Sequence, residues 1–294
     1  MKKYNLITPE GTRDLLFEEC TARRNIETKL MELFRANGYS EVITPSLEFY
    51  DVFSGFPQEA MYKLSDSRGR LMVIRPDSTI PIIRLAETRL KDEPRPLKLC
   101  YNQTIYNVNP KEAGRDDEIA QCGIEAIGVN DDDAVLTLAM QVFKVIGLDY
   151  RFEIGNCSFF DVLIREHSIN ADNAEKIRQL VETKNYPELT AMGVPHVFAE
   201  LPKLFGGEEV FDKAEKLFKC EYLSELRNVY KKLDSDKITV DLGLTNTRGY
   251  YTGILFNGYV EGYGKPVLSG GKYTISNTAA TGFAVDVSAI AGLG

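Results

Sequence analysis

The segment Ile74-Arg75-Pro76-Asp77-Ser78-Thr79 follows the strand-like apolar run of residues 71–74, and Arg84 stands further on. Proline and aspartate are typical of turns, so residues 75–77 taken alone read as a strand end followed by a turn. A functional role for the segment depends on which other polar segments accompany it along the chain.

A second segment, Gln121-Cys122-Gly123-Ile124-Glu125, lies in another strand-like run. Gln121 and Glu125 are an even number of residues apart, so both side chains point to the same face of an extended strand. A polar pair that faces inward from an apolar strand is costly unless protein groups or a ligand satisfy it. The pair therefore marks a candidate binding surface.

Two further segments attract attention, Tyr250-Tyr251-Thr252-Gly253 and Ser269-Gly270-Gly271-Lys272-Tyr273. A tyrosine pair is more often part of a core than a ligand contact. Two adjacent glycines are usually a turn. Each segment alone therefore has an ordinary structural interpretation.

The order of expected elements around these segments predicts the fold class. Residues 14–37 have the apolar spacing of an amphipathic helix that Gly38 ends, and strand-like runs, Glu41-Val42-Ile43-Thr44 among them, continue to about residue 129. A helix over residues 132–146 and a strand precede a helix-rich stretch, after which strand signals return. The pattern predicts an α+β fold with a discontinuous core of residues 1–158 and 235–294 and a helical insertion over 159–234.

Composition limits the classes of protein that the chain can represent. Its net charge is −8 and no basic run is longer than a pair, which disfavours tRNA or another nucleic acid as a partner. The five cysteines and two histidines show no metal-ligand spacing, so we expect no metal. Walker A and dinucleotide fingerprints are missing, and we expect no cofactor. No signal peptide and no apolar run of about 18 residues occur, so a cytoplasmic protein with no membrane association is expected.

In order and spacing, the segments together resemble the catalytic core of the histidyl-tRNA synthetase family along nearly the whole chain. Pro9-Glu10-Gly11-Thr12-Arg13-Asp14 resembles the N-terminal signature of the family, and the helix running into Thr44-Pro45 resembles class II motif 1. The resemblance implies a class II aminoacyl-tRNA synthetase-like core, which is a mixed, mostly antiparallel sheet flanked by helices. It also implies a homodimer through the motif 1-like region.

The same resemblance implies a histidine-binding pocket. A zwitterion with an imidazole needs carboxylates for its ammonium, an acceptor for a ring N–H and aromatic walls. The positions that match the substrate-holding residues of the family are Asp77, Thr79, Gln121, Glu125, Tyr250 and Tyr251. Asp77 is one methylene shorter than the family glutamate, so its contact with an amino group is looser or mediated by water.

The ATP site is where this sequence departs from the family pattern. Three family arginines, from motif 2, the histidine-specific loop and motif 3, are matched here by Asn107, Asn246 and Ala289, and Asp286 replaces a glycine. Charge that develops on the α-phosphate needs fixed cationic donors, and losing one typically costs about 10²–10³ in rate. We therefore expect no catalytic residues and no aminoacylation. The end of the chain after the motif 3-like strand predicts no anticodon-binding domain.

Within this resemblance, the segments Leu242-Gly243-Leu244 and Leu204-Phe205-Gly206-Gly207 look closer to the regulatory subunits of short-form ATP phosphoribosyltransferase. This likeness implies a non-catalytic subunit needed for the first step of histidine biosynthesis and for its feedback regulation by histidine. It implies a catalytic transferase subunit as partner, a hetero-octamer and L-histidine as a possible ligand. Two alternatives remain, a divergent histidyl-tRNA synthetase core and a stand-alone histidine-binding module.

Overall fold

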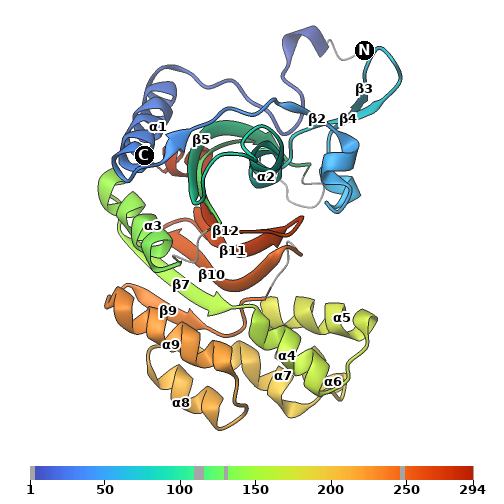
Figure 1. Cartoon of the computed structure of the whole chain (residues 1–294), viewed down its shortest axis with the longest axis vertical. Coiled ribbons are helices and arrows are strands. Elements are labelled where there is room, and N and C mark those ends of the chain that lie inside the picture. The colour runs from blue at the N-terminus through green and yellow to red at the C-terminus, as the bar shows by residue number, and fades with distance from the viewer. Residues whose placement is uncertain (1–3, 109–115, 129–131, 246–248, 294) are drawn as a thin grey trace. The chain divides into compact units, whose positions relative to one another are not determined.

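The computed structural model of the chain describes residues 4–108, 116–128, 132–245 and 249–293 (Figure 1). It divides into two compact units, which are described separately. Unit 1 consists of Met1–Gly128 and Ala284–Gly294, and unit 2 consists of Val129–Phe283. Strand β12 runs from unit 2 into unit 1.

Unit 1 contains two groups of paired strands. Its strands are β1 (Ser40–Glu41), β2 (Leu47–Phe49), β3 (Lys63–Ser65), β4 (Leu71–Ile74), β5 (Leu97–Tyr106) and β6 (Glu118–Ile127). β5 pairs with β1 in parallel and with β6 antiparallel, in continuous register from Leu97↔Ile127 to Tyr106↔Glu118. β4 lies between β2 and β3 in a separate antiparallel sheet.

Three α-helices of unit 1 are described, α1 (Phe17–Ala36), α2 (Thr79–Thr88) and α10 (Val287–Ala291). Three short 3-10 turns, at Tyr4–Leu6, Tyr50–Phe53 and Gln58–Ala60, accompany them. The buried face of α1, with Leu30 and Phe34 fully covered, packs on β5, β6 and α10. The helix predicted for residues 14–37 is confirmed, and Gly38 adopts φ +82° just past its end, as a helix-ending glycine does.

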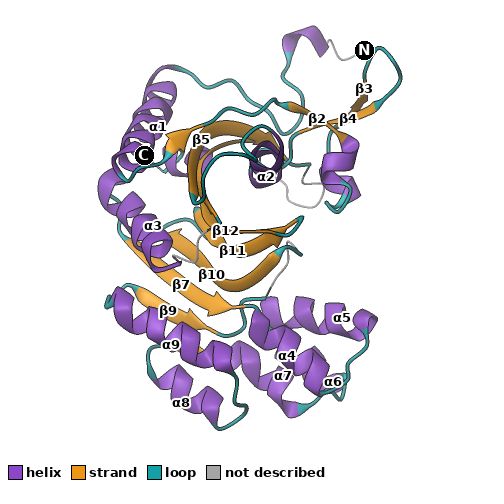
Figure 2. Ribbon diagram, in the orientation of Figure 1, coloured by secondary structure: helices purple, strands orange, loops and turns teal. Residues whose placement is uncertain are grey.

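The strands of unit 2 form a mixed sheet, which Figure 2 shows in orange. They are β7 (Tyr150–Asn156), β8 (Phe205–Gly206), β9 (Ile238–Asp241), β10 (Tyr251–Val260), β11 (Leu268–Ile275) and the greater part of β12 (Thr278–Asp286). In the sheet their order is β12-β11-β10-β7-β9-β8. β10 pairs antiparallel with β7 and β11, whereas β7 and β9 are parallel.

The helices of unit 2 pack on this sheet and on one another. They are α3 (Asp132–Ile146), α4 (Ser158–Glu166), α5 (Ala171–Glu182), α6 (Tyr186–Ala191), α7 (His196–Glu200), α8 (Glu209–Glu215) and α9 (Glu221–Leu233), with a 3-10 turn at Leu201–Lys203. α3 lies on β10 and β11, and α9 lies on β7 (Figure 1). A Cβ on Gly258 of β10 would lie 2.4 Å from the Phe143 ring of α3. Because strand side chains alternate, Asn257 and Tyr259 point to the opposite face.

These elements confirm the predicted α+β class, with a mixed sheet flanked by helices. The strand expected at Glu41-Val42-Ile43-Thr44 is shorter than predicted, because β1 ends at Glu41. The glycine pair 270–271 lies inside β11 and not in a turn. The domain boundaries expected at residues 158 and 235 stay a prediction, although α4 to α9 fall between Ser158 and Leu233. None of the described helices is long and apolar enough to cross a membrane.

Candidate functional site

The strand-to-helix turn of unit 1 holds two of the residues that the sequence singled out. β4 ends at Ile74 and α2 begins at Thr79. Between them, the buried Arg75 side chain donates hydrogen bonds to the backbone oxygens of Thr44 (2.7 Å) and Thr104 (2.8 Å). These bonds fix the turn, and the Asp77 carboxylate accepts a 3.0 Å bond from the backbone N–H of Ile80.

Glu125 is brought directly to this turn. It lies on β6 with only 1% of its surface exposed, and the Thr79 hydroxyl donates a 2.7 Å hydrogen bond to its carboxylate. Gln121 is on the same face of β6, about 13 Å further along an extended strand. The extended strand on which the parity argument rests is therefore confirmed, while a shared ligand contact for these residues stays a prediction.

The two tyrosines of the expected pocket belong to unit 2, where they form an aromatic cluster. The rings of Tyr250 and Tyr251 have centroids 4.9 Å apart, and Tyr250 meets Tyr273 edge-on at 5.8 Å. Tyr251 pairs with Tyr273 across β10 and β11. The structure thus joins the tyrosine pair to the Gly270-Gly271-Lys272-Tyr273 segment, as their resemblance to one site implied.

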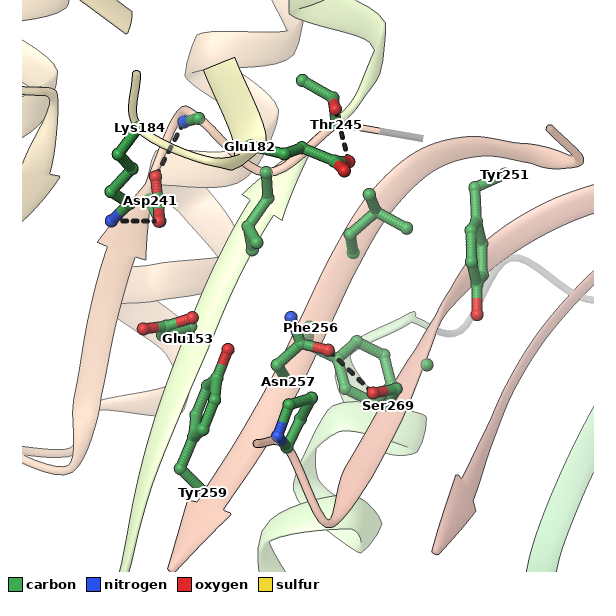
Figure 3. A pocket seen from close by; sticks show the side chains of 15 residues that line it. Glu153, Glu182, Lys184, Asp241, Thr245, Tyr251, Phe256, Asn257, Tyr259 and Ser269 are labelled. Carbon is green, nitrogen blue, oxygen red and sulfur yellow. Dashed lines mark hydrogen bonds and ion pairs between the residues drawn. The ribbon is translucent and has the colours of Figure 1, made fainter. Parts of the chain in front are cut away.

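A cavity of about 420 Å³ opens beside Tyr251 on the face of the unit 2 sheet that carries Asn257 and Tyr259 (Figure 3). Its floor includes Glu153 of β7, and Glu182 and Lys184 come from the end of α5 and the residues after it. Sequence reasoning missed these charged residues. The sequence does contain a signal for one of them, because Glu153 is an acidic residue between the apolar Phe152 and Ile154 of a strand.

The carboxyl groups of the cavity differ in their surroundings. Asp241 is buried, receives the Gly243 N–H at 2.7 Å and forms a 3.2 Å ion pair with Lys184. Burial raises the pKa of Glu153, and the hydrogen bond from the Tyr259 hydroxyl partly offsets that rise. Burial likewise raises the pKa of Glu182, against the hydrogen bond that Thr245 donates to it. Desolvation is the common cause, because it disfavours a charged carboxylate.

Two of the three positions that the resemblance matches to family arginines are described and take part in local hydrogen bonds. The Asn107 side-chain amide donates a 2.9 Å hydrogen bond to the Pro76 carbonyl. Ala289 lies in α10, and its N–H donates at 2.8 Å to Asp286, which caps that helix. The third position, Asn246, lies outside the described residues. At the two described positions neither side chain carries a positive charge for a phosphate; the Asn107 side chain and the Ala289 backbone N–H are used in local hydrogen bonds.

The described residues include no group of three or more histidine, cysteine, aspartate or glutamate side chains that could hold a metal ion. The cavity acids therefore face a cavity without converging on one point in the manner of metal ligands.

Comparison with known proteins agrees with this geometry. The family model described as histidyl-tRNA synthetase matches residues 11–290. An ATP phosphoribosyltransferase regulatory subunit of Clostridium kluyveri is 38% identical, with 99% of this chain and 82% of that protein covered. One of Acetivibrio thermocellus is 36% identical, with 99% and 77% covered.

Solved structures show the same relationship. One from Bacillus halodurans, described as an ATP phosphoribosyltransferase regulatory subunit/histidyl-tRNA synthetase, superposes with a TM-score of 0.89 at 30% identity, covering 99% of this chain and 84% of that one. A histidyl-tRNA synthetase from Nostoc has a TM-score of 0.81 at 19% identity, covering 99% and 76%, which shows a shared fold.

Proposed function

The chain belongs to the ATP phosphoribosyltransferase regulatory subunit family, within the histidyl-tRNA synthetase fold, and we propose that it serves as the non-catalytic subunit of that transferase. In this role it supports the first step of histidine biosynthesis and its feedback regulation. The observation that carries the proposal is the likeness to named regulatory subunits over 99% of the chain.

The described ATP-site positions support the same assignment. Activation of an amino acid needs cationic donors on the α-phosphate. Asn107 is bonded to a backbone carbonyl, and a carboxylate, Asp286, caps the helix that contains Ala289. A protein with these side chains retains a synthetase-like frame without the means to stabilise the transition state.

We further propose that L-histidine is its ligand, held by Asp77, Thr79, Gln121, Glu125, Tyr250 and Tyr251. The hydrogen bond from Thr79 to Glu125 supports this, because it orients a buried carboxylate. A carboxylate accepts hydrogen bonds from N–H donors, which histidine has. Regulation requires that histidine bind two states of the assembly with different affinity.

Association completes the proposal. The partner is the catalytic short-form transferase subunit, in a cytoplasmic hetero-octamer built on homodimers. Large apolar side chains exposed near the motif 1-like region support the homodimer, notably Leu16 (60% exposed), Phe17 (84%) and Ile43 (80%). Exposed groups of this kind mark contact surfaces on soluble proteins.

The test is co-expression of the full chain with the catalytic short-form subunit from the same source. We expect the two to co-purify and the transferase to be active only in the complex. Separate elution, together with full activity of the catalytic subunit alone, would contradict the proposed role.

Calorimetric titration with L-histidine tests the ligand. We expect Glu125→Gln to weaken binding about tenfold or more, since a buried donor–acceptor match is lost, and exposed Glu32→Gln to leave it unchanged. If the folded chain and the complex both give no heat with L-histidine, the pocket assignment is wrong.

A further inference from the structure

The cavity of unit 2 is not accounted for by the histidine pocket, with which it shares only Tyr251. Its volume of about 420 Å³ is within the usual range for small-molecule sites, about 300–1,000 Å³. The lining includes the apolar Leu255 and Pro266 and, near the two ends of β10, the phenol rings of Tyr251 and Tyr259. The space therefore suits a small ligand with a flat or apolar body.

The charges that face the cavity are unbalanced. Its described lining carries three carboxyl groups and one amine. The amine, Lys184, is paired with Asp241 and lies 4.5 Å over the Phe205 ring. Among the described residues, neither Glu153 nor Glu182 has a lysine or arginine at ion-pair distance, and the hydrogen bonds that each receives come from hydroxyls.

Those hydroxyls orient both glutamates. Figure 3 shows Glu153 beside Tyr259 and Glu182 beside Thr245, at the edge of the same space. A carboxylate has room for about four hydrogen bonds. Each glutamate thus keeps acceptor capacity toward the cavity. Because burial desolvates both carboxyl groups, binding of a positively charged N–H donor to them is favourable.

We propose that this cavity binds a small planar organic cation, of the amidinium, guanidinium or imidazolium type, through N–H donors to Glu153, with Glu182 adding a second carboxyl group to the same lining. The bonds are charge-assisted, and the ring of Tyr259, beside Glu153, adds attraction to the face of the cation. An anion would meet the two carboxylates and is excluded from the site by charge. Binding at this site requires neither L-histidine nor the transferase partner.

The probe is benzamidinium, a planar cation, with the neutral and nearly isosteric benzamide as its matched control. Calorimetry on the full chain is expected to show benzamidinium binding and much weaker benzamide binding. Glu153→Gln and Glu182→Gln keep the shape of the cavity; Glu153→Gln is expected to weaken benzamidinium about tenfold or more and Glu182→Gln to weaken it less. Glu166→Gln, an exposed acid in the same unit, is expected to change nothing.

Binding should also release protons. The free carboxyl groups have raised pKa values, and a bound cation lowers them, so affinity rises with pH and the heat depends on the buffer. If Glu153 had only a structural role, the Glu153→Gln variant would release the same number of protons on binding as the wild type. Thermal unfolding of each variant establishes that it is folded.

The inference would be overturned by no heat from benzamidinium with the folded chain, or by equal affinity in the wild type and in Glu153→Gln. Asp77→Asn separates this site from the histidine pocket. It is expected to weaken L-histidine and leave benzamidinium unchanged. If it weakens benzamidinium equally, the cation is bound in the histidine pocket and the cavity proposal is wrong.

Discussion

Gly270 and Gly271 stand in the middle of β11 because other atoms occupy the space of a side chain. A Cβ on Gly270 would lie 2.4 Å from the Gly282 carbonyl oxygen. One on Gly271 would lie 2.6 Å from the Ile254 carbonyl oxygen and 3.1 Å from the Tyr251 ring. The glycine pair thus lets the neighbouring strands approach closely and leaves room for the Tyr251 ring. Interpreting two adjacent glycines as a turn does not reveal this.

We expect Gly271→Ala to destabilise the protein by about 1–3 kcal/mol, because the added methyl overpacks a strand interior. Urea unfolding measures the change. Gly264→Ala is the matched control, since a Cβ there has nothing within 4 Å, and it is expected to stay within about 0.5 kcal/mol of wild type. A Gly271→Ala protein as stable as the control would refute the packing argument.

Asp117 and Tyr62 form a second pair that matters at the scale of single residues. The Tyr62 hydroxyl donates a 2.6 Å hydrogen bond to Asp117, and this bond, with burial, raises the pKa of Tyr62 to about 12. The backbone N–H of Asp117 also donates a 2.7 Å hydrogen bond to the backbone oxygen of Gly11 in the N-terminal segment. The pair therefore helps to anchor the Pro9–Asp14 signature.

Replacing Asp117 by Asn should lower the pKa of Tyr62 toward the ordinary value of about 10. Phenolate absorbance followed with pH, taken as a difference from Tyr62→Phe, measures it. Because the folded pKa is raised, the pair stabilises the fold below pH about 10 and loses this contribution as pH rises toward 12. An unchanged Tyr62 titration in Asp117→Asn would show that the bond is not the cause.

Among elements, α10 shows how a short helix at a position that the resemblance matches to motif 3 is held in place. The five-residue helix begins after Asp286, whose carboxylate accepts from the Ala289 N–H. The Ser288 hydroxyl accepts from the Ala120 N–H of β6 at 2.9 Å, which ties the helix to that strand. A carboxylate at a helix start is favourable because it satisfies an otherwise unpaired N–H.

Removal of this cap by Asp286→Ala should cost about 0.5–2 kcal/mol of stability. Asp286→Asn, which retains an accepting oxygen, should lose less. Thermal and urea unfolding of the two variants measures the difference. Equal losses in both variants would mean that the charge of Asp286, and not the cap, stabilises this end of the chain.

For the whole molecule, the decisive expectation concerns activity. The chain should show no histidine-dependent exchange of pyrophosphate into ATP above a blank. Asn107→Arg alone should not restore it, since the motif 3-like position is still Ala289 and Asp286 remains beside it in sequence. Exchange by the wild-type chain at a rate above the blank would contradict the non-catalytic assignment.

The sequence by itself determined the class of the fold and the family. Apolar periodicity placed α3 at Asp132–Ile146 and predicted α1 with a start three residues too early, and the strand-like runs located β4, β5 and β10. The motif spacing identified the synthetase-like frame, and the missing arginines are visible in the sequence because charge is a property of single residues.

Tertiary structure decided what spacing cannot express. Thr79 and Glu125 are 46 residues apart and meet only because β6 passes the start of α2. Glu153, Glu182 and Tyr259 face one cavity because β7, the end of α5 and β10 converge there, and no sequence period links them. The desolvation that changes their pKa values exists only after the chain has folded, since it depends on which atoms exclude water.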